Sequence, residues 1–229
     1  MTSTWVRALL VSAVLFAVPS SASATSIYFN TPSPALFTWT TETIPLSGGG
    51  WVVDDWDGGV AATQAQIQYV LANLQAMYIL IEWRTGPDDT NVDNIFFGTG
   101  ASETFGSGLG GWYTAGPDPD SDIAGQSFGT GVPSWDASFG QPAGSLRDQD
   151  GFFWHWIAAP SAFLGNQSAR YGETLSFDIF IRHTDGVPYP AVALVAPDPV
   201  PEPATMMLLG GGLVGLFCAR RRGSLRRRG

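Results

Sequence analysis

Residues 175–182 read Leu-Ser-Phe-Asp-Ile-Phe-Ile-Arg, and this stretch determines the fold class. Its apolar and polar positions alternate. One face carries Leu175, Phe177, Ile179 and Ile181, and the other carries Ser176, Asp178, Phe180 and Arg182. A period of two is typical of a β-strand with one face buried in a core. We therefore predict a strand over Leu175–Arg182 in an all-β domain.

Further short segments on both sides of this strand are rich in β-branched and aromatic residues and are separated by turn residues. They predict strands at Ser26–Asn30, Phe37–Pro45, Trp51–Val53, Met77–Trp83, Asp93–Phe97, Gly151–Ile157 and Ala191–Val195. The segment Gly98–Asp150 is rich in Gly, Pro, Ser and Asp. Its composition predicts a region dominated by loops.

One stretch departs from the β pattern and predicts an amphipathic helix. Thr63 and Gln66 have the spacing of a capping box, in which each side chain bonds the backbone of the other residue. Apolar residues follow at helical spacing, at Ile67, Val70, Leu71 and Leu74. We expect this helix to end near Gln75 or Ala76.

The N-terminus has the pattern of a secretory signal peptide over residues 1–24. Arg7 supplies a positive charge, Ala8–Val18 is an apolar core, and Ala22-Ser23-Ala24 provides small residues for cleavage. We expect export by the general secretion machinery and a mature chain that starts near Thr25. The remaining body, residues 25–197, suits one sandwich-sized domain.

The C-terminal tail, residues 198–229, has three parts. Val200-Pro201-Glu202-Pro203 precedes an apolar run over Ala204–Ala219, and Arg220-Arg221-Arg222 follows it. The run is slightly shorter than the roughly 17–25 residues that cross a hydrocarbon core, but we expect it to span a thin membrane as a helix. The arginines then place the C-terminus in the cytoplasm.

This tail resembles the PEP-CTERM sorting signal of Gram-negative bacteria at Val200–Pro203, at the apolar span and at the arginines. The resemblance implies that an exosortase, a membrane transpeptidase, recognises the Pro-Glu-Pro element. It would remove the tail from an inner-membrane intermediate and release the body to the cell surface or the extracellular polysaccharide matrix. The alternative is a plain single-pass anchor.

Charge and cysteine usage exclude some functions. The body contains four arginines, no lysine and nearly all of the 20 acids of the chain. Such a surface repels phosphate backbones, so we expect no nucleic-acid partner. The one cysteine, Cys218, lies in the apolar span, which leaves the body without a disulfide or a thiol nucleophile.

The body resembles a laminin B (laminin IV type A) domain whose two halves are exchanged. The motifs of the opening half are Trp156, Ala159-Pro160, Phe163-Leu164-Gly165, Tyr171-Gly172 and Leu175-Ser176-Phe177, and those of the closing half are Trp39–Leu46, Trp51, Thr63–Gln75, Ile79–Trp83 and Asp93-Asn94-Ile95. The closing half, 25–98, comes first here, and the opening half, 101–197, follows. The resemblance implies a jelly-roll-like, galactose-binding-like β-sandwich that is circularly permuted.

A permuted domain makes spatial predictions that two truncated tandem halves do not. The strand at Asp93–Phe97 should lie antiparallel to one starting near Glu103, because Gly98–Ala101 is too short for any other arrangement. Ala191–Val195 should lie beside Ser26–Asn30. A single core should contain Leu71, Ile79, Phe163 and Phe177.

Patterns that suggest catalysis are weak in this chain, and we expect no catalytic residues. Gly125–Gly129 matches the Gly-x-Ser-x-Gly pattern of a nucleophile elbow, but the sequence predicts no buried strand before it, which that motif requires. His155 reads as a packed strand residue. The acid pairs Asp54/Asp57 and Asp148/Asp150 read as exposed turns rather than as the carboxylates of a glycosidase.

Two kinds of binding site are compatible with the sequence. A structural calcium ion, as in related sandwiches, would use hard oxygen ligands, with Asp93, Glu103 and Asp178 as candidates. Trp56, Trp112 and Trp135 are candidates for stacking on sugar rings, although core filling is the simpler role. No other cofactor is expected.

We therefore expect an exported, non-enzymatic β-sandwich that acts in adhesion or in association with extracellular polysaccharide. A carbohydrate-binding module with a defined glycan site is the main alternative, and a glycoside-active enzyme is the third.

Overall fold

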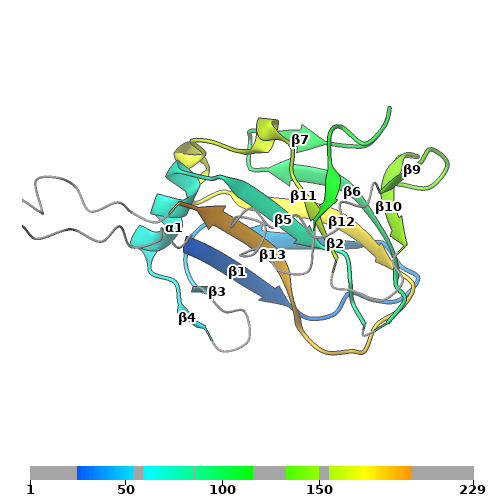
Figure 1. Ribbon diagram of the computed structural model, residues 1–229, viewed down its shortest axis with the longest axis horizontal. Helices are drawn as coiled ribbons and strands as arrows, with labels where there is room; N and C mark the ends of the chain where they lie inside the picture. The colour runs from blue at the N-terminus through cyan, green and yellow to red at the C-terminus, as the bar shows by residue number, and fades with distance from the viewer. Residues whose placement is uncertain (1–24, 54–58, 85, 116–132, 150–154, 198–229) are drawn as a thin grey trace, which may run out of the picture.

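The computed structural model describes residues 25–53, 59–84, 86–115, 133–149 and 155–197. They form two antiparallel sheets and one helix (Figure 1). The seven-stranded sheet has the order β4 (Val60–Ala61), β3 (Trp51–Val53), β1 (Thr25–Thr31), β13 (Tyr189–Ala196), β5 (Ala76–Leu80), β11 (Trp156–Ala158), β8 (Tyr113–Ala115). The six-stranded sheet has the order β2 (Thr40–Pro45), β12 (Thr174–Ile181), β6 (Asp89–Phe97), β10 (Ser145–Gln149), β9 (Ser134–Asp136), and β7 (Ser102–Glu103) pairs with β6.

The alternating stretch forms β12, as predicted, between β2 and β6 in the six-stranded sheet. Its four apolar positions from Leu175 to Ile181 are fully buried, whereas Ser176, Asp178 and Phe180 are only half-buried. The buried face packs into the core and the other face forms part of the outer surface of the sheet. The all-β sandwich class is therefore confirmed.

One hydrophobic cluster contains the buried hydrophobic residues of the described body. Leu71, Ile79, Phe163 and Phe177 all belong to it, as expected from the sequence. Trp51, Trp83 and Trp156 are its largest fully buried side chains. Burying a large aromatic side chain stabilises a fold by roughly 1.5–3 kcal/mol, so these three anchor the sandwich.

The helix α1 (Gln64–Ala72) begins as predicted, with a complete capping box between Thr63 and Gln66. It ends earlier than expected, at the C-cap residue Asn73. The reason is tertiary: the Leu74 amide donates to Gly165 and the Gln75 amide donates to Val195, so the backbone has already turned toward the sheet. Two 3₁₀ turns, at Ser161–Phe163 and Ser168–Arg170, lie in the same connection as Gly165.

The pairings expected for a permuted domain are present. β6 and β7 are antiparallel neighbours joined by a tight turn, with Ile95 opposite Glu103. β1 and β13 pair along their whole length, from Thr25 opposite Ala196 to Thr31 opposite Tyr189. These adjacencies are confirmed, whereas the relationship to the laminin B domain stays a prediction.

The segment Gly98–Asp150 differs most from its predicted secondary structure. Four strands, β7 to β10, lie within this range, although it was expected to be mostly loop. They have two to five residues each, which is too short for a periodic pattern to stand out from turn residues. The two-residue β4 was missed for the same reason.

Strand boundaries differ elsewhere as well. β6 starts at Asp89, four residues before the predicted Asp93, because the whole segment pairs with β12 and β10. β2 starts at Thr40, because Phe37 has a left-handed φ of +55° that interrupts extended backbone. Of the strand predicted at Gly151–Ile157, the structure describes only the end, as β11.

Several predicted segments lie outside the described residues. They are the signal peptide with Ala22 and Ala24, Trp56, Val200–Pro203, the span Ala204–Ala219 and Arg220–Arg222. Within the described parts of the chain, no helix has the length and apolarity needed to cross a membrane.

Candidate functional site

The two ends of the described body meet at one place. Thr25 pairs directly with Ala196, and the hydroxyl of Tyr69 on α1 donates to the carbonyl of Pro197 at 2.7 Å. The start of β1, the end of β13 and α1 therefore lie together, as Figure 1 shows. We call this region the termini end.

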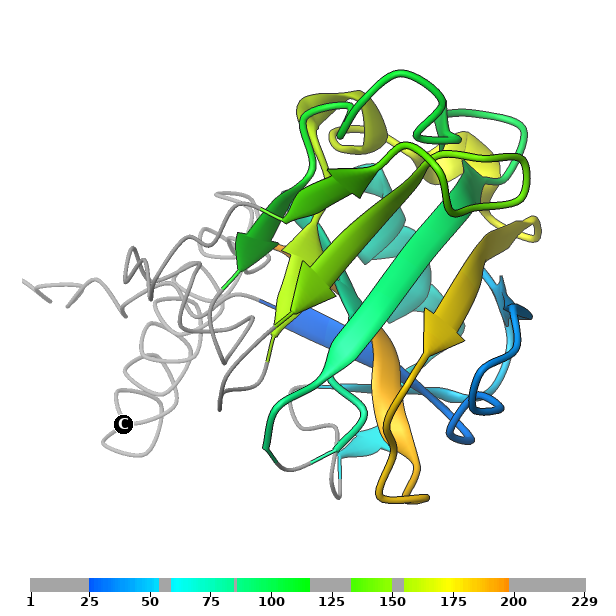
Figure 2. The same cartoon turned by 90° about the vertical axis from the view of Figure 1, so that its right-hand side faces the viewer.

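The opposite end of the sandwich, the far end, is formed by segments 32–39 and 182–188. These segments contact each other, because Ser33 Oγ lies 2.5 Å from Thr184 Oγ1 and the Phe37 amide donates to the Ile181 carbonyl at 2.9 Å. Figure 2 views the molecule from this end, with α1 behind the strands.

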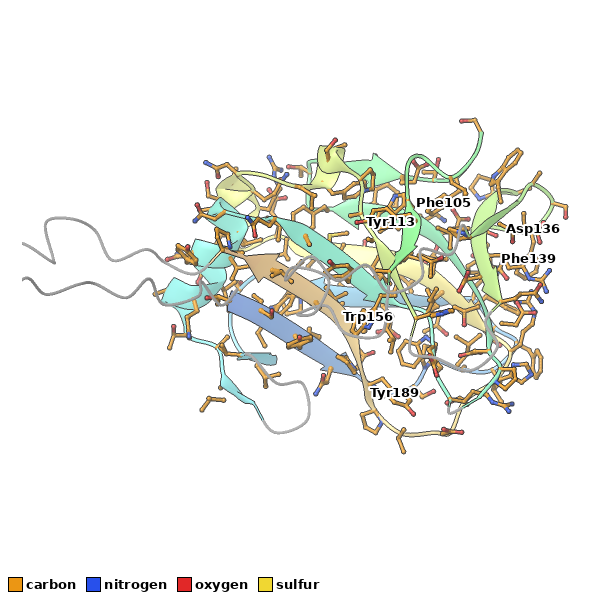
Figure 3. The ribbon with its side chains drawn as sticks, viewed as in Figure 1. Phe105, Tyr113, Asp136, Phe139, Trp156 and Tyr189 are labelled. Atoms are coloured by element: carbon orange, nitrogen blue, oxygen red, sulfur yellow. The ribbon has the colours of Figure 1, made fainter. Side chains whose placement is uncertain are left out.

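Three aromatic rings cluster on the outer face of the six-stranded sheet near the far end. Trp39 precedes β2, Phe139 lies between β9 and β10, and Phe180 is on the outward face of β12. Trp39 stacks on Phe139 with ring centroids 5.3 Å apart, and Phe180 lies 5.6 Å from Trp39 and 4.9 Å from Phe139. Figure 3 shows Phe139 on the side of the molecule away from α1. All three rings are half-buried, so part of each faces solvent.

Arg182 connects this aromatic cluster to a polar network. Its guanidinium carbon lies 5.3 Å from the Phe139 ring centre and 4.9 Å from that of Phe180, within the range of a cation–π contact. The same side chain donates to Asp89 at 3.0 Å and to Asn91 at 2.7 Å. The polar contacts thereby hold the guanidinium beside the two rings.

Asp89 is the acceptor at the centre of the network. Arg147 binds it through two donors, Nε at 2.9 Å and Nη2 at 2.6 Å, and Gln149 donates at 3.0 Å. Burial by itself would raise the pKa of Asp89. The hydrogen bond from Arg147 and the charges of Arg182 and Arg147 outweigh burial and lower the pKa. Asp89 in turn raises the pKa of the Arg147 guanidinium through their hydrogen bond.

Phe37 extends the apolar surface of the far end. It is 66 % exposed, and its φ of +55° is a conformation that bulky residues seldom adopt. Leu36 beside it and Val187 in segment 182–188 are 43 % and 44 % exposed. A strained backbone that presents an aromatic ring to water indicates a contact role, because neither the strain nor the exposure stabilises the fold.

Two of the three candidate calcium ligands, Asp93 and Asp178, lie opposite each other, but all three already accept hydrogen bonds. Asp93 lies opposite Asp178 in the β6–β12 pair, at a bulge where Asn94 has a φ of +49°. Asp93 accepts from the backbone amides of Asn94 and Gln141, and Asp178 accepts from Thr41 and Asn94. Glu103 accepts from the amides of Thr104 and Phe105.

These contacts fasten a surface loop to the sheet. Asn94 also donates to the Gln141 carbonyl, so Asp93 and Asn94 together hold the backbone that carries Phe139. Burial raises the pKa of Asp93, while its two backbone donors oppose the shift and Asp178 and Glu103 add to it. Among the residues that the structure describes, no group of three or more acids, histidines or cysteines is arranged to hold a metal ion.

Trp112 and Trp135, the two selected tryptophans that the structure describes, are not members of the aromatic cluster. Trp112 is 2 % exposed and packs on Phe105 and Phe163, so its assignment as a stacking residue is wrong. Trp135 is 42 % exposed, but its indole nitrogen donates to the Phe105 carbonyl. Trp56 lies outside the described residues. The cluster residues were missed, although Phe180 gave a signal as an aromatic residue on the polar face of an alternating strand.

His155 is half-buried just before β11, with Nδ1 3.2 Å from Asp148 Oδ2. Asp148 is also within 3.4 Å of the Thr114 hydroxyl. These contacts join β10 in the six-stranded sheet to β8 and to the residue before β11 in the seven-stranded sheet, which accounts for His155 as a structural residue.

Comparison with known proteins adds one finding, at the end of the chain that follows the termini end. Residues 199–222 match the PEP-CTERM protein-sorting motif. The motif starts two residues after Pro197, the last described residue. It implies an exported protein that is targeted to an exosortase and processed at the membrane surface. No curated protein and no solved structure matches the chain.

Proposed function

We propose that this protein is a non-catalytic component of the extracellular polysaccharide layer or cell surface of a Gram-negative bacterium. Its exported sandwich would associate with polysaccharide through the far end. An exosortase is its processing partner. The carbohydrate-binding role ranks above general adhesion because the aromatic cluster lies on the surface, with polar groups beside it.

The observation that carries this proposal is the position of the cluster relative to the sorting motif. The motif follows the termini end, where α1 and the last strand meet. While the tail is attached, the termini end lies closest to the membrane and the far end lies furthest from it. Phe37, Trp39 and the cluster therefore face the surroundings of the cell.

The chemistry of the far end suits sugar rings. Sugar-binding sites combine aromatic faces, which cover apolar C–H groups, with a small number of fixed polar groups that orient hydroxyls. Here Phe37, Trp39 and Phe180 supply the rings, and the Arg182–Asp89 pair supplies fixed donors and acceptors. Because the body is acidic, we expect neutral polymers to bind better than acidic ones.

The test is a binding assay of the processed protein on neutral polysaccharides, first as a pull-down panel and then by titration. Phe37→Ala removes an exposed ring without opening the core. We expect the Kd to rise about tenfold, which corresponds to about 1.4 kcal/mol. Phe96→Ala is the matched control, because Phe96 is also an exposed aromatic residue, at 42 %, but lies toward the termini end of β6.

The two variants distinguish the possible outcomes. If Phe37→Ala and the parent protein bind polysaccharide equally well, the far end is not the binding surface. Failure of the parent protein to bind any polysaccharide in the panel would leave general adhesion as the better function.

A further inference from the structure

Charge is divided between the two sheets. Every strand of the six-stranded sheet, β7 included, carries at least one charged residue, such as Glu42 in β2 and Asp136 in β9. The strands of the seven-stranded sheet carry none, and neither does α1. Residues 59–81 and 187–197 contain no Asp, Glu, Lys, Arg or His at all. In a chain with a formal net charge of −9, this division is large.

Among the residues that the structure describes, the uncharged ones include the exposed residues of α1 at the termini end. On α1, the exposed residues are Gln64, Ala65 and Gln68, followed by Asn73 and Gln75 after its last turn. The helix has no acidic residue in its first turn and no basic residue in its last. The amide side chains of the glutamines and of Asn73 form hydrogen bonds with polar groups without adding charge.

The tail restricts how far this surface lies from the membrane. Tyr69 binds the Pro197 carbonyl and so fixes where the chain leaves the sandwich. From Pro197 to Ala204, the first residue of the apolar run, the chain reaches at most about 25 Å when fully extended. Before the tail is removed, α1 therefore stays within a short distance of the lipid headgroups.

We propose that the termini end, formed by α1 and the adjoining ends of β1 and β13, is the surface that rests on the lipid headgroups while the tail is in place. The proposal rests on the membrane-bound intermediate of the proposed function but not on polysaccharide binding. Its ligand class is the polar headgroup layer of a phospholipid membrane.

Electrostatics explain why this end should be uncharged. Each acid near an anionic lipid surface is repelled by an amount on the order of 1 kcal/mol, the magnitude known for basic residues with the opposite sign. An acidic body on a short tether avoids this cost if its uncharged end faces the lipid and its charged sheet faces away. The charges of Arg170 and Glu173, in the connection that packs on α1, compensate each other through an ion pair at 3.2 Å.

The experiment uses the full chain in phospholipid vesicles, with Cys218→Ser so that an introduced cysteine carries the only label. A fluorophore at Gln68→Cys reports on α1, and one at Val187→Cys reports on the far end. Both positions are exposed. A quencher attached to the lipid headgroups should reduce the Gln68 signal at least threefold more than the Val187 signal.

A variant with two added negative charges tests whether electrostatic repulsion determines how closely α1 approaches the lipid. Gln64→Glu with Gln75→Glu should weaken quenching at Gln68 in vesicles with about 30 % anionic lipid and leave it unchanged in neutral vesicles. Thr43→Glu with Ser107→Glu, at exposed positions outside the termini end, is the matched control and should have no effect.

Three results would overturn the proposal: equal quenching at both labels, no response to the paired glutamates, or a chain that does not co-float with vesicles. The polysaccharide assay uses processed protein without the tail, so its result is independent of all three.

Discussion

At the scale of single residues, Asp89 is the clearest case for a test, because three side chains converge on it. We expect Asp89→Asn to reduce the free energy of unfolding at pH 7 by about 1 kcal/mol, a small value because the arginines stay partly hydrated. The pKa of Asp89 is lower in the folded protein than in the unfolded chain. Its contribution to the free energy of unfolding is therefore fully present above the ordinary aspartate pKa, and it is lost as the pH falls through the pKa of the folded state.

The measurement is urea unfolding of the processed protein at pH 7 and near pH 3. The parent protein and Asp89→Asn should differ at pH 7 and converge in acid. A difference that keeps its full size from pH 7 down to pH 3 would mean that Asp89 acts through packing rather than through its charge.

Single residues also show which features could be predicted from the sequence. Residue type and spacing identified the buried face of β12 and the capping box at Thr63, because both depend on neighbours within a few positions. Whether a given tryptophan is exposed depends on which loop folds over it. Trp112 is covered by Phe105, which precedes it by seven residues, and by Phe163, which is distant in sequence, so the local pattern alone did not identify these partners.

Among the elements, β2 stands out because it is an edge strand of the six-stranded sheet in the described part of the chain. Glu42 lies opposite Phe177 and so points to the core side, where burial raises its pKa. An inward-pointing charge at an edge strand discourages pairing with another molecule. Glu42 thus reduces stability and protects against aggregation.

This assignment predicts opposite effects of one substitution. Glu42→Val should increase the stability of the monomer at pH 7, because a penalised charge is removed, and should cause self-association. Light scattering after size exclusion, together with thermal unfolding, measures both. Thr43→Val, on the outward face of the same strand, is the control and should stay monomeric. If Glu42→Val also stays monomeric at high concentration, the protective role is wrong.

The shortest strands were the hardest to predict from the sequence. β12 was predicted almost in full, and β1 and β13 were predicted in their central residues, Ser26–Asn30 and Ala191–Val195. β6 has nine residues, but only its second half was predicted. β7, β8 and β9 have two or three residues and exist because longer strands provide partners, which no local pattern encodes.

For the whole molecule, the permuted arrangement can be tested by reversing it. The chain would be opened between Thr99 and Gly100, and Pro197 would be joined to Thr25 by a short glycine-serine linker. Because Thr25 and Ala196 are paired, such a linker closes without strain. We expect a folded protein with a similar circular dichroism spectrum and somewhat lower stability, since the β6–β7 turn is lost.

A matched control opens the chain within β13, between Val192 and Ala193, with the same linker. This permutant should not fold, because its cut divides a buried central strand. If both permutants fold equally well, the fold is insensitive to chain order and the reversed arrangement gains no support.

Processing of the tail gives the second prediction at this scale. Mature protein extracted from the cell surface should lack Ala204–Gly229, because the sorting motif places an exosortase substrate element just before that segment. Intact-mass spectrometry of the extracted protein measures this. Retention of the tail in wild-type cells would favour the plain membrane anchor.

The position of β13 has a consequence for secretion. It is the last strand of the sandwich to be synthesised, yet it lies between β1 and β5, and every one of its eight residues is buried. Until it emerges, the seven-stranded sheet is two separate pieces, and most of the pairing that β1 requires does not exist. A domain whose closing piece arrives last has a long average sequence separation between contacts and folds slowly. We expect such a chain to remain unfolded, and hence able to pass through a narrow channel, until nearly all of it has crossed the membrane.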